Sequence, residues 1–173
     1  KRKSVVLLGL RGAGKSTIGP LLAERVGVEF VELDSLVEER AGLGLTEIFS
    51  LHGEQYYRRM ENLCLGELLG DDRPVVVALS GGVVNNVEAF ERVKQECITV
   101  WLEALPQDHM DRVLAQGDFR PVVNRDDAMA ELEALMELRE PFYQQASIRV
   151  HTSELDVHEV VKNIQRSLER EEH

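Results

Sequence analysis

The residues with the clearest chemistry form a glycine-rich run near the N-terminus, Gly9-Leu10-Arg11-Gly12-Ala13-Gly14-Lys15-Ser16-Thr17. The run fits the pattern G-x-x-x-x-G-K-[ST] at each fixed position. Its glycines permit backbone conformations that a Cβ forbids, so successive N–H groups can point at one anion. Lys15 can reach the β- and γ-phosphates of a nucleotide, and the Ser16 hydroxyl can ligate Mg²⁺. We therefore expect Gly9, Arg11, Gly12, Ala13, Gly14, Lys15, Ser16 and Thr17 to contact a bound nucleotide.

The elements around this run alternate between apolar strands and amphipathic helices. Strands are expected at 4–8, 28–33, 75–79, 98–102 and 148–151, and helices at 15–26, 36–41, 46–51, 54–69, 87–95, 106–116, 125–140 and 157–168. This alternation predicts an α/β fold, a parallel sheet with helices on both faces. Ligands of such sheets bind beyond the carboxyl ends of the strands. The rule gathers the glycine-rich run, Glu32, Asp34 and residues 80–82 at one edge.

Two carboxylates lie at the end of the second expected strand, Glu32 within it and Asp34 just past it. Asp34 can orient or deprotonate an attacking hydroxyl, which is the base role in phosphoryl transfer, or it can cap the helix expected at 36–41. Glu32 can hold Mg²⁺ through water, or it can be a solvated strand end. The sequence alone leaves both pairs of interpretations open.

Three arginines could recognise anions. Arg58 and Arg139 lie on helices that enter the same side of the sheet, so together they could grip an anionic acceptor. Arg120 lies in a loop with Gly117 and Asp118 that could close over nucleotide phosphates. For each arginine, ordinary surface exposure is the alternative. Ser80-Gly81-Gly82 allows close backbone approach to a ligand, or is simply a turn.

The composition is that of one soluble globular domain covering residues 1–173, with 43% hydrophobic and 29% charged residues. A net charge of −11 argues against binding nucleic acid or an anionic membrane through bulk electrostatics. Cys64 and Cys97 lie in apolar contexts without metal-ligand spacing, so we expect buried free thiols and a cytoplasmic location. No apolar run approaches the roughly 20 residues of a membrane span.

A set of motifs resembles the shikimate kinase family in order and spacing across nearly the whole chain. The motifs are GLRGAGKST at 9–17, ELD at 32–34, GEQYYRR at 53–59, SGG at 80–82, FRP at 119–121 and ELREPFY at 137–143. The resemblance implies a five-stranded parallel sheet of order 2-3-1-4-5 with a mobile lid, ATP with Mg²⁺, and phosphate transfer to the 3-hydroxyl of shikimate by a cytoplasmic monomer.

The resemblance also implies roles for individual residues. It makes Asp34 the residue that orients or deprotonates the hydroxyl, Lys15 the phosphate lysine, and Arg120 the arginine of a lid at about 112–127. The acceptor region is about 33–61. The residues implied to bind the acceptor are Asp34, Phe49, Tyr57, Arg58, Gly81, Gly82 and Arg139, with Phe49 and Tyr57 as apolar walls.

Several positions depart from the family pattern. Glu32 stands where the family usually has Asp, and Ser80 replaces the first of three glycines. Val122-Val123-Asn124 follows Pro121 in place of a Leu-Leu pair. Arg112 is the nearest match to an arginine that packs near the adenine, although Val113 can hold the aligned place.

A second resemblance provides an alternative function. HMDRVLAQGDFRP at 109–121, with the glycine-rich run, is similar to the shikimate-kinase-like effector domain of benzoyl-CoA-responsive transcriptional regulators. That likeness implies binding of a coenzyme A thioester, a dimer, and a helix-turn-helix domain preceding this one; a start at Lys1 without Met is compatible with such an excision. A third hypothesis is a small-molecule kinase of the gluconate kinase type. The pair Arg58 and Arg139 disfavours it, because an acceptor of different charge would leave these guanidinium groups without a partner.

Overall fold

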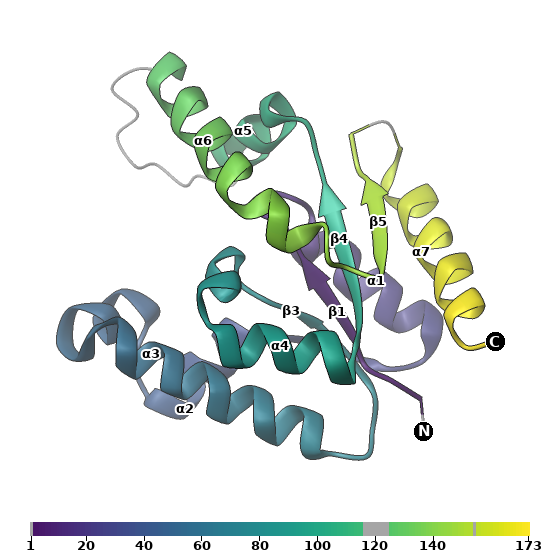
Figure 1. Ribbon diagram of the computed structural model, residues 1–173, viewed down its shortest axis with the longest axis horizontal. Coiled ribbons are helices and arrows are strands. Elements are labelled where there is room, and N and C mark those ends of the chain that lie inside the picture. Colours follow the sequence, from purple (N-terminus) through teal and green to yellow (C-terminus); the bar gives the residue numbers. More distant parts are fainter. Residues whose placement is uncertain (1, 116–124, 154) are drawn as a thin grey trace.

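The computed structural model describes residues 2–115, 125–153 and 155–173 (Figure 1). The elements in chain order are β1 (Val5–Leu8), α1 (Lys15–Val26), β2 (Glu29–Glu32), α2 (Leu33–Ala41), α3 (Leu45–Gly70), β3 (Val75–Ala78), the 3₁₀ helix η1 (Gly81–Asn85), α4 (Val87–Glu96), β4 (Ile98–Glu103), α5 (Pro106–Ala115), α6 (Arg125–Tyr143), β5 (Ile148–His151) and α7 (Val157–Glu171).

The five strands form one parallel sheet of order β2-β3-β1-β4-β5, as expected. Val6 of the central strand β1 pairs with Val77 of β3 on one side and with Thr99 of β4 on the other. All residues of β1 and β3 are apolar and buried, because helices cover both faces of the sheet.

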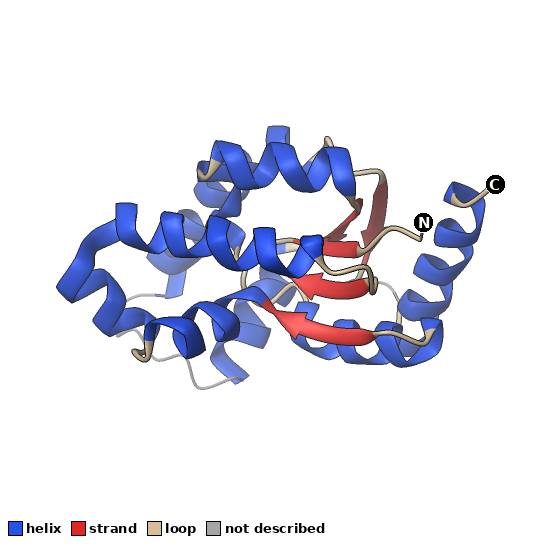
Figure 2. Ribbon diagram, turned by 90° about the horizontal axis from the view of Figure 1, so that it is seen from below, coloured by secondary structure: helices blue, strands red, loops and turns tan. Residues whose placement is uncertain are grey.

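The core is divided between the two faces of the sheet, and the alternation of side chains along β1 makes the division. Val6 and Leu8 pack with residues of α2, α3 and α4, whereas Val5 and Leu7 pack with residues of α1 and α7. Figure 2 shows helices flanking the strands. The loops and helix starts that follow the strands are thereby held at one edge.

Some element boundaries differ from the sequence-based expectation. The second helix begins at Leu33, not at residue 36, and Asp34 lies inside its first turn. The expected helices 46–51 and 54–69 form the single element α3, broken only at Gly53, whose φ of 82° and ψ of 174° are not helical. Residues 81–85 form a 3₁₀ helix instead of an open turn.

The last two helices also extend further than expected. The helix expected at 125–140 continues past Pro141 and ends at Tyr143. A proline this close to the end removes few backbone hydrogen bonds, which explains the tolerance. The helix expected at 157–168 likewise continues to Glu171. In the part of the chain that the structure describes, no helix combines the length and apolarity needed to cross a membrane.

Candidate active site

The glycine-rich run forms the loop between β1 and α1, and its backbone depends on glycine. Gly9, Gly12 and Gly14 have φ values of 153°, 81° and 106°, which L side chains rarely adopt. A Cβ on Gly9 would also lie 2.8 Å from the carbonyl oxygen of Leu102 in β4. The loop therefore holds its shape only with glycine at these positions, and it ends at the positive N-terminal end of α1.

Lys15, the first residue of α1, folds back over this loop. Its Nζ donates a hydrogen bond to the carbonyl oxygen of Gly9. Burial lowers the pKa of Lys15 to about 8 from its ordinary value, while the charges of Asp34 and Glu32 oppose this shift and that of Arg139 adds to it. These residues, which come from three separate helices and a strand end, therefore meet around one ammonium group.

Ser16 and Glu32 form an oxygen-only pair beside the phosphate loop. Ser16 Oγ donates a hydrogen bond to Glu32 Oε1 at 2.6 Å. A hydroxyl and a carboxylate, with water completing the shell, fit the preference of Mg²⁺ for oxygen ligands. The described residues contain no cluster of three or more His, Cys, Asp or Glu side chains that could form an all-protein metal cage. The metal role of Ser16 and Glu32 stays a prediction.

Asp34 does not cap α2, because it lies within the helix and the N-cap position is Glu32. Its Oδ1 instead accepts a hydrogen bond of 2.5 Å from the Tyr57 hydroxyl. The same hydroxyl lies 3.1 Å from Glu61 Oε2. Burial, then the charges of Glu61 and Asp34, raise the pKa of Tyr57, and the neighbouring Ser80 hydroxyl opposes the rise.

Tyr57, expected to be an apolar wall of the acceptor pocket, has an apolar ring and a hydroxyl in different surroundings. Its ring packs against Phe49 with centroids 4.8 Å apart, and the Arg58 guanidinium lies 5.1 Å from the ring centre. Phe49 itself is 43% exposed, so its outer part is available to a ligand. The Tyr57 hydroxyl, however, faces carboxylates.

Arg58 and Arg139 converge on Gly81 and Gly82 at the start of η1. A Cβ built on Gly81 would lie 2.5 Å from Arg139 Nη1, and one on Gly82 would lie 3.1 Å from Arg58 Nη2. Both glycines thus leave room for guanidinium groups, and the two arginines come from helices far apart in sequence. Among the described residues, no group accepts a hydrogen bond from the buried Arg58 Nε.

Three residues that the sequence-based reasoning missed hold this arrangement. Glu61 is fully buried and accepts hydrogen bonds from Arg58 Nη1 at 3.1 Å and Asn86 Nδ2 at 2.9 Å. Tyr143 donates to the Gly81 carbonyl oxygen at 3.0 Å. Helical spacing could have indicated two of them, since Glu61 follows Arg58 by three residues and Tyr143 follows Arg139 by four.

Of the remaining expected site residues, the structure describes some and leaves others outside the described part of the chain. Arg11 and Thr17 are exposed on the loop and on the first turn of α1. Arg112 lies on α5, but its side chain is outside the described part of the structure. Arg120 and most of the lid expected at about 112–127 also lie outside the described residues.

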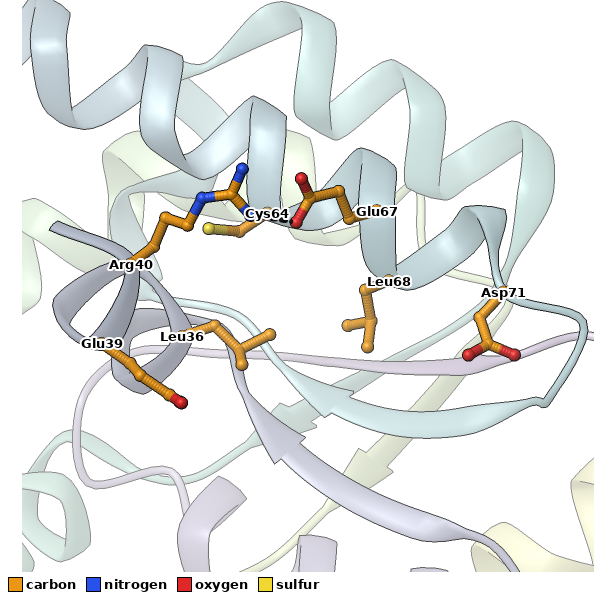
Figure 3. Close-up of a pocket in the computed structure, with 7 residues that line it drawn as sticks. All are labelled: Leu36, Glu39, Arg40, Cys64, Glu67, Leu68 and Asp71. Carbon is orange, nitrogen blue, oxygen red and sulfur yellow. Dashed lines mark hydrogen bonds and ion pairs between the residues drawn. The ribbon is translucent and has the colours of Figure 1, made fainter.

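A separate cavity of about 500 Å³ lies between α2 and the C-terminal half of α3 (Figure 3). Leu36, Cys64 and Leu68 form its apolar lining, and an ion pair of 2.5 Å joins Arg40 to Glu67 beside them. None of the expected site residues lines this cavity.

A phosphate loop on a parallel sheet of order 2-3-1-4-5, with a carboxylate and two arginines facing it, defines a P-loop small-molecule kinase. The model of the shikimate kinase family matches residues 11–169. The chain belongs to the shikimate kinase family.

Similar proteins agree with this assignment. Shikimate kinase of Symbiobacterium thermophilum is 38% identical over 168 residues, covering 96% of each chain. Shikimate kinase of Chlorobaculum parvum is 34% identical over 173 residues, covering 96% of this chain and 92% of its own. The solved structure of shikimate kinase from Acinetobacter baumannii in complex with shikimate superposes with a TM-score of 0.85 at 28% identity, covering 98% of this chain and 94% of that one.

Proposed function

We propose that this protein transfers the γ-phosphate of ATP to the 3-hydroxyl of shikimate, a step of aromatic amino-acid biosynthesis. The observation that carries the proposal is the convergence of Arg58 and Arg139 on Gly81 and Gly82, with Arg139 and Asp34 close enough to Lys15 for their charges to act on it. Two guanidinium groups suit the carboxylate of shikimate, because each can form paired hydrogen bonds with a carboxylate.

In the proposed reaction, different residues bind the phosphates, bind the acceptor and accept the proton. The loop N–H groups and Lys15 hold the phosphates, while Arg58 and Arg139 fix the acceptor by its carboxylate. Asp34 orients the acceptor hydroxyl and accepts its proton. Mg²⁺, held through Ser16 and Glu32, would neutralise charge on the β- and γ-phosphates. Arg120 is proposed to reach the transferring phosphoryl group from the lid.

The similarity to benzoyl-CoA-responsive regulators is the weaker alternative. The relatives that match at 38% and 34% identity over nearly the full length carry the name shikimate kinase, which favours the enzyme. We propose a cytoplasmic monomer. The free, buried Cys64 and Cys97 support a reducing compartment, and size-exclusion chromatography with light scattering would reveal the dimer expected of a regulator.

A coupled assay of ADP release with shikimate tests the proposal. We expect turnover by the wild-type chain, and loss of turnover with retained Mg-ATP binding in Asp34→Asn. Absent turnover while Mg-ATP binding is intact would refute the proposed function. Heat of binding to benzoyl-CoA, together with thermal stabilisation, would then favour the effector domain.

A further inference from the structure

The hydroxyl of Tyr57 lies between two carboxylates, and its single proton can serve only one of them. Tyr57 is 3% exposed, so water does not compete for this proton. The distance to Asp34 Oδ1 is 2.5 Å and that to Glu61 Oε2 is 3.1 Å. Glu61 has other donors in Arg58 and Asn86. The geometry therefore assigns the proton to Asp34.

This hydrogen bond fixes one end of the Asp34 carboxylate. Asp34 accepts no other hydrogen bond from the residues that the structure describes. With Oδ1 held from α3, the remaining oxygen is the one free to meet an acceptor hydroxyl. Orienting a reacting group before the chemical step is a large source of rate enhancement, and small displacements reduce it strongly.

We propose that Tyr57 is a positioning residue of the phosphoryl transfer, and that its hydroxyl holds Asp34 in the orientation that receives the acceptor hydroxyl. The inference rests on the proposed function and adds to it a residue otherwise expected to be an apolar wall. In this proposal the ring and the hydroxyl of Tyr57 have different roles. The ring packs against Phe49 and the Arg58 guanidinium, and the hydroxyl donates a hydrogen bond to Asp34.

Tyr57→Phe keeps the ring and removes only the hydroxyl. We expect kcat to fall on the order of tenfold, with the KM for shikimate within about twofold of the wild-type value, because acceptor binding by the arginines is untouched. Glu61→Gln is the matched comparison, since Glu61 contacts the same hydroxyl but also holds Arg58. That variant should raise the KM for shikimate. If Tyr57→Phe raises KM as Glu61→Gln does, or leaves kcat unchanged, the positioning role is overturned.

A second measurement does not depend on turnover. Tyr57→Phe, Asp34→Ala and the double variant form a cycle of urea unfolding midpoints. Because the hydrogen bond is lost in either single variant, the double variant should shift the midpoint by an amount that differs from the sum of the single shifts. Additive shifts would show that the two groups do not interact and would overturn the inference. Wild-type protein that fails to turn over shikimate but shows a non-additive cycle would refute the proposed function while leaving the Tyr57–Asp34 interaction supported.

Discussion

Gly81→Ala adds one methyl group at the point where Arg139 crosses η1. The added Cβ would lie 2.5 Å from Arg139 Nη1, whereas ordinary van der Waals contacts begin at 3.4 Å. The next neighbours, the Gly9 carbonyl oxygen and the Tyr143 hydroxyl, lie at an acceptable 3.5 Å. Gly81 is not among the glycines with positive φ, so the backbone accepts alanine. The guanidinium of Arg139 must therefore move by about 1 Å, the difference between the contact limit and the built distance.

This movement should affect the site much more than the fold. An arginine side chain is flexible at its far end, so the free energy of unfolding should change by less than about 1 kcal/mol. A hydrogen bond between the acceptor carboxylate and a charged donor contributes about 1.5–3 kcal/mol, so its loss should raise the KM for shikimate by about 10- to 150-fold. The kcat should change little, because the proposed contact of Arg139 with the acceptor carboxylate would be the same in the ground state and in the transition state.

The coupled ADP-release assay over a range of shikimate concentrations measures this change, and urea unfolding checks the fold. Gly70→Ala is the matched control, because a Cβ there meets nothing within 4 Å. We expect wild-type kinetics from the control. An unchanged KM in Gly81→Ala, with both variants folded, would show that Arg139 does not bind the acceptor.

Three further predictions concern the nucleotide site, the thiols and the core. Because burial lowers the pKa of Lys15 to about 8 and nucleotide phosphates favour its charged form, ADP binding at pH 8 should take up about half a proton. Calorimetry in two buffers of different ionisation enthalpy measures this proton uptake. The uptake should decrease toward pH 7 and be absent in Lys15→Arg. Equal heats in both buffers would contradict the lowered pKa of Lys15. Burial raises the pKa of the Cys64 thiol, and it raises the pKa of the Cys97 thiol to about 11. Alkylation of the folded protein at pH 8 should therefore be much slower than alkylation of the urea-unfolded chain. Equal rates would contradict the burial of both thiols. Gly19→Ala would place a Cβ 2.2 Å from the Phe30 ring, and this overpacking should destabilise the fold by about 1–3 kcal/mol in urea titrations; an unchanged unfolding midpoint would show that the ring can move aside.

The sheet and the phosphate loop could be predicted because their physical requirements are local. Continuous apolar runs such as Val5–Leu8 suit strands buried on both faces, and the spacing of Gly9, Gly12 and Gly14 matches the backbone angles that the loop adopts. The start of α2 was less predictable. Asp34 is a favourable N-cap residue, but it is also favourable in a first turn, and local preference does not decide between the two.

The environment of Tyr57 could not be predicted from local pattern, because it depends on packing between elements. An aromatic residue at an apolar helical position suggests a wall of the pocket, and its ring packs against that of Phe49. The direction of its hydroxyl depends on how α3 packs against α2, which brings Asp34 within 2.5 Å. Polar contacts across two helices are set by tertiary geometry, so a motif match assigns the position without assigning the contact.

The charges at this edge of the sheet also bear on the parts of the site that stay predictions. Among the described residues, three cationic and four anionic side chains gather here: Lys15, Arg58 and Arg139, and Glu32, Asp34, Glu54 and Glu61. The side chains therefore nearly balance one another before any ligand binds. A nucleotide triphosphate and an acceptor carboxylate add several negative charges to this balanced set, and burying them without compensation would be costly. We propose that Mg²⁺ held through Ser16 and Glu32, together with Arg120, adds the positive charge that such a complex requires. Removal of Mg²⁺, or Arg120→Ala, should thus weaken phosphate transfer more than it weakens binding of shikimate alone, and equal losses in both measurements would contradict this balance of charge.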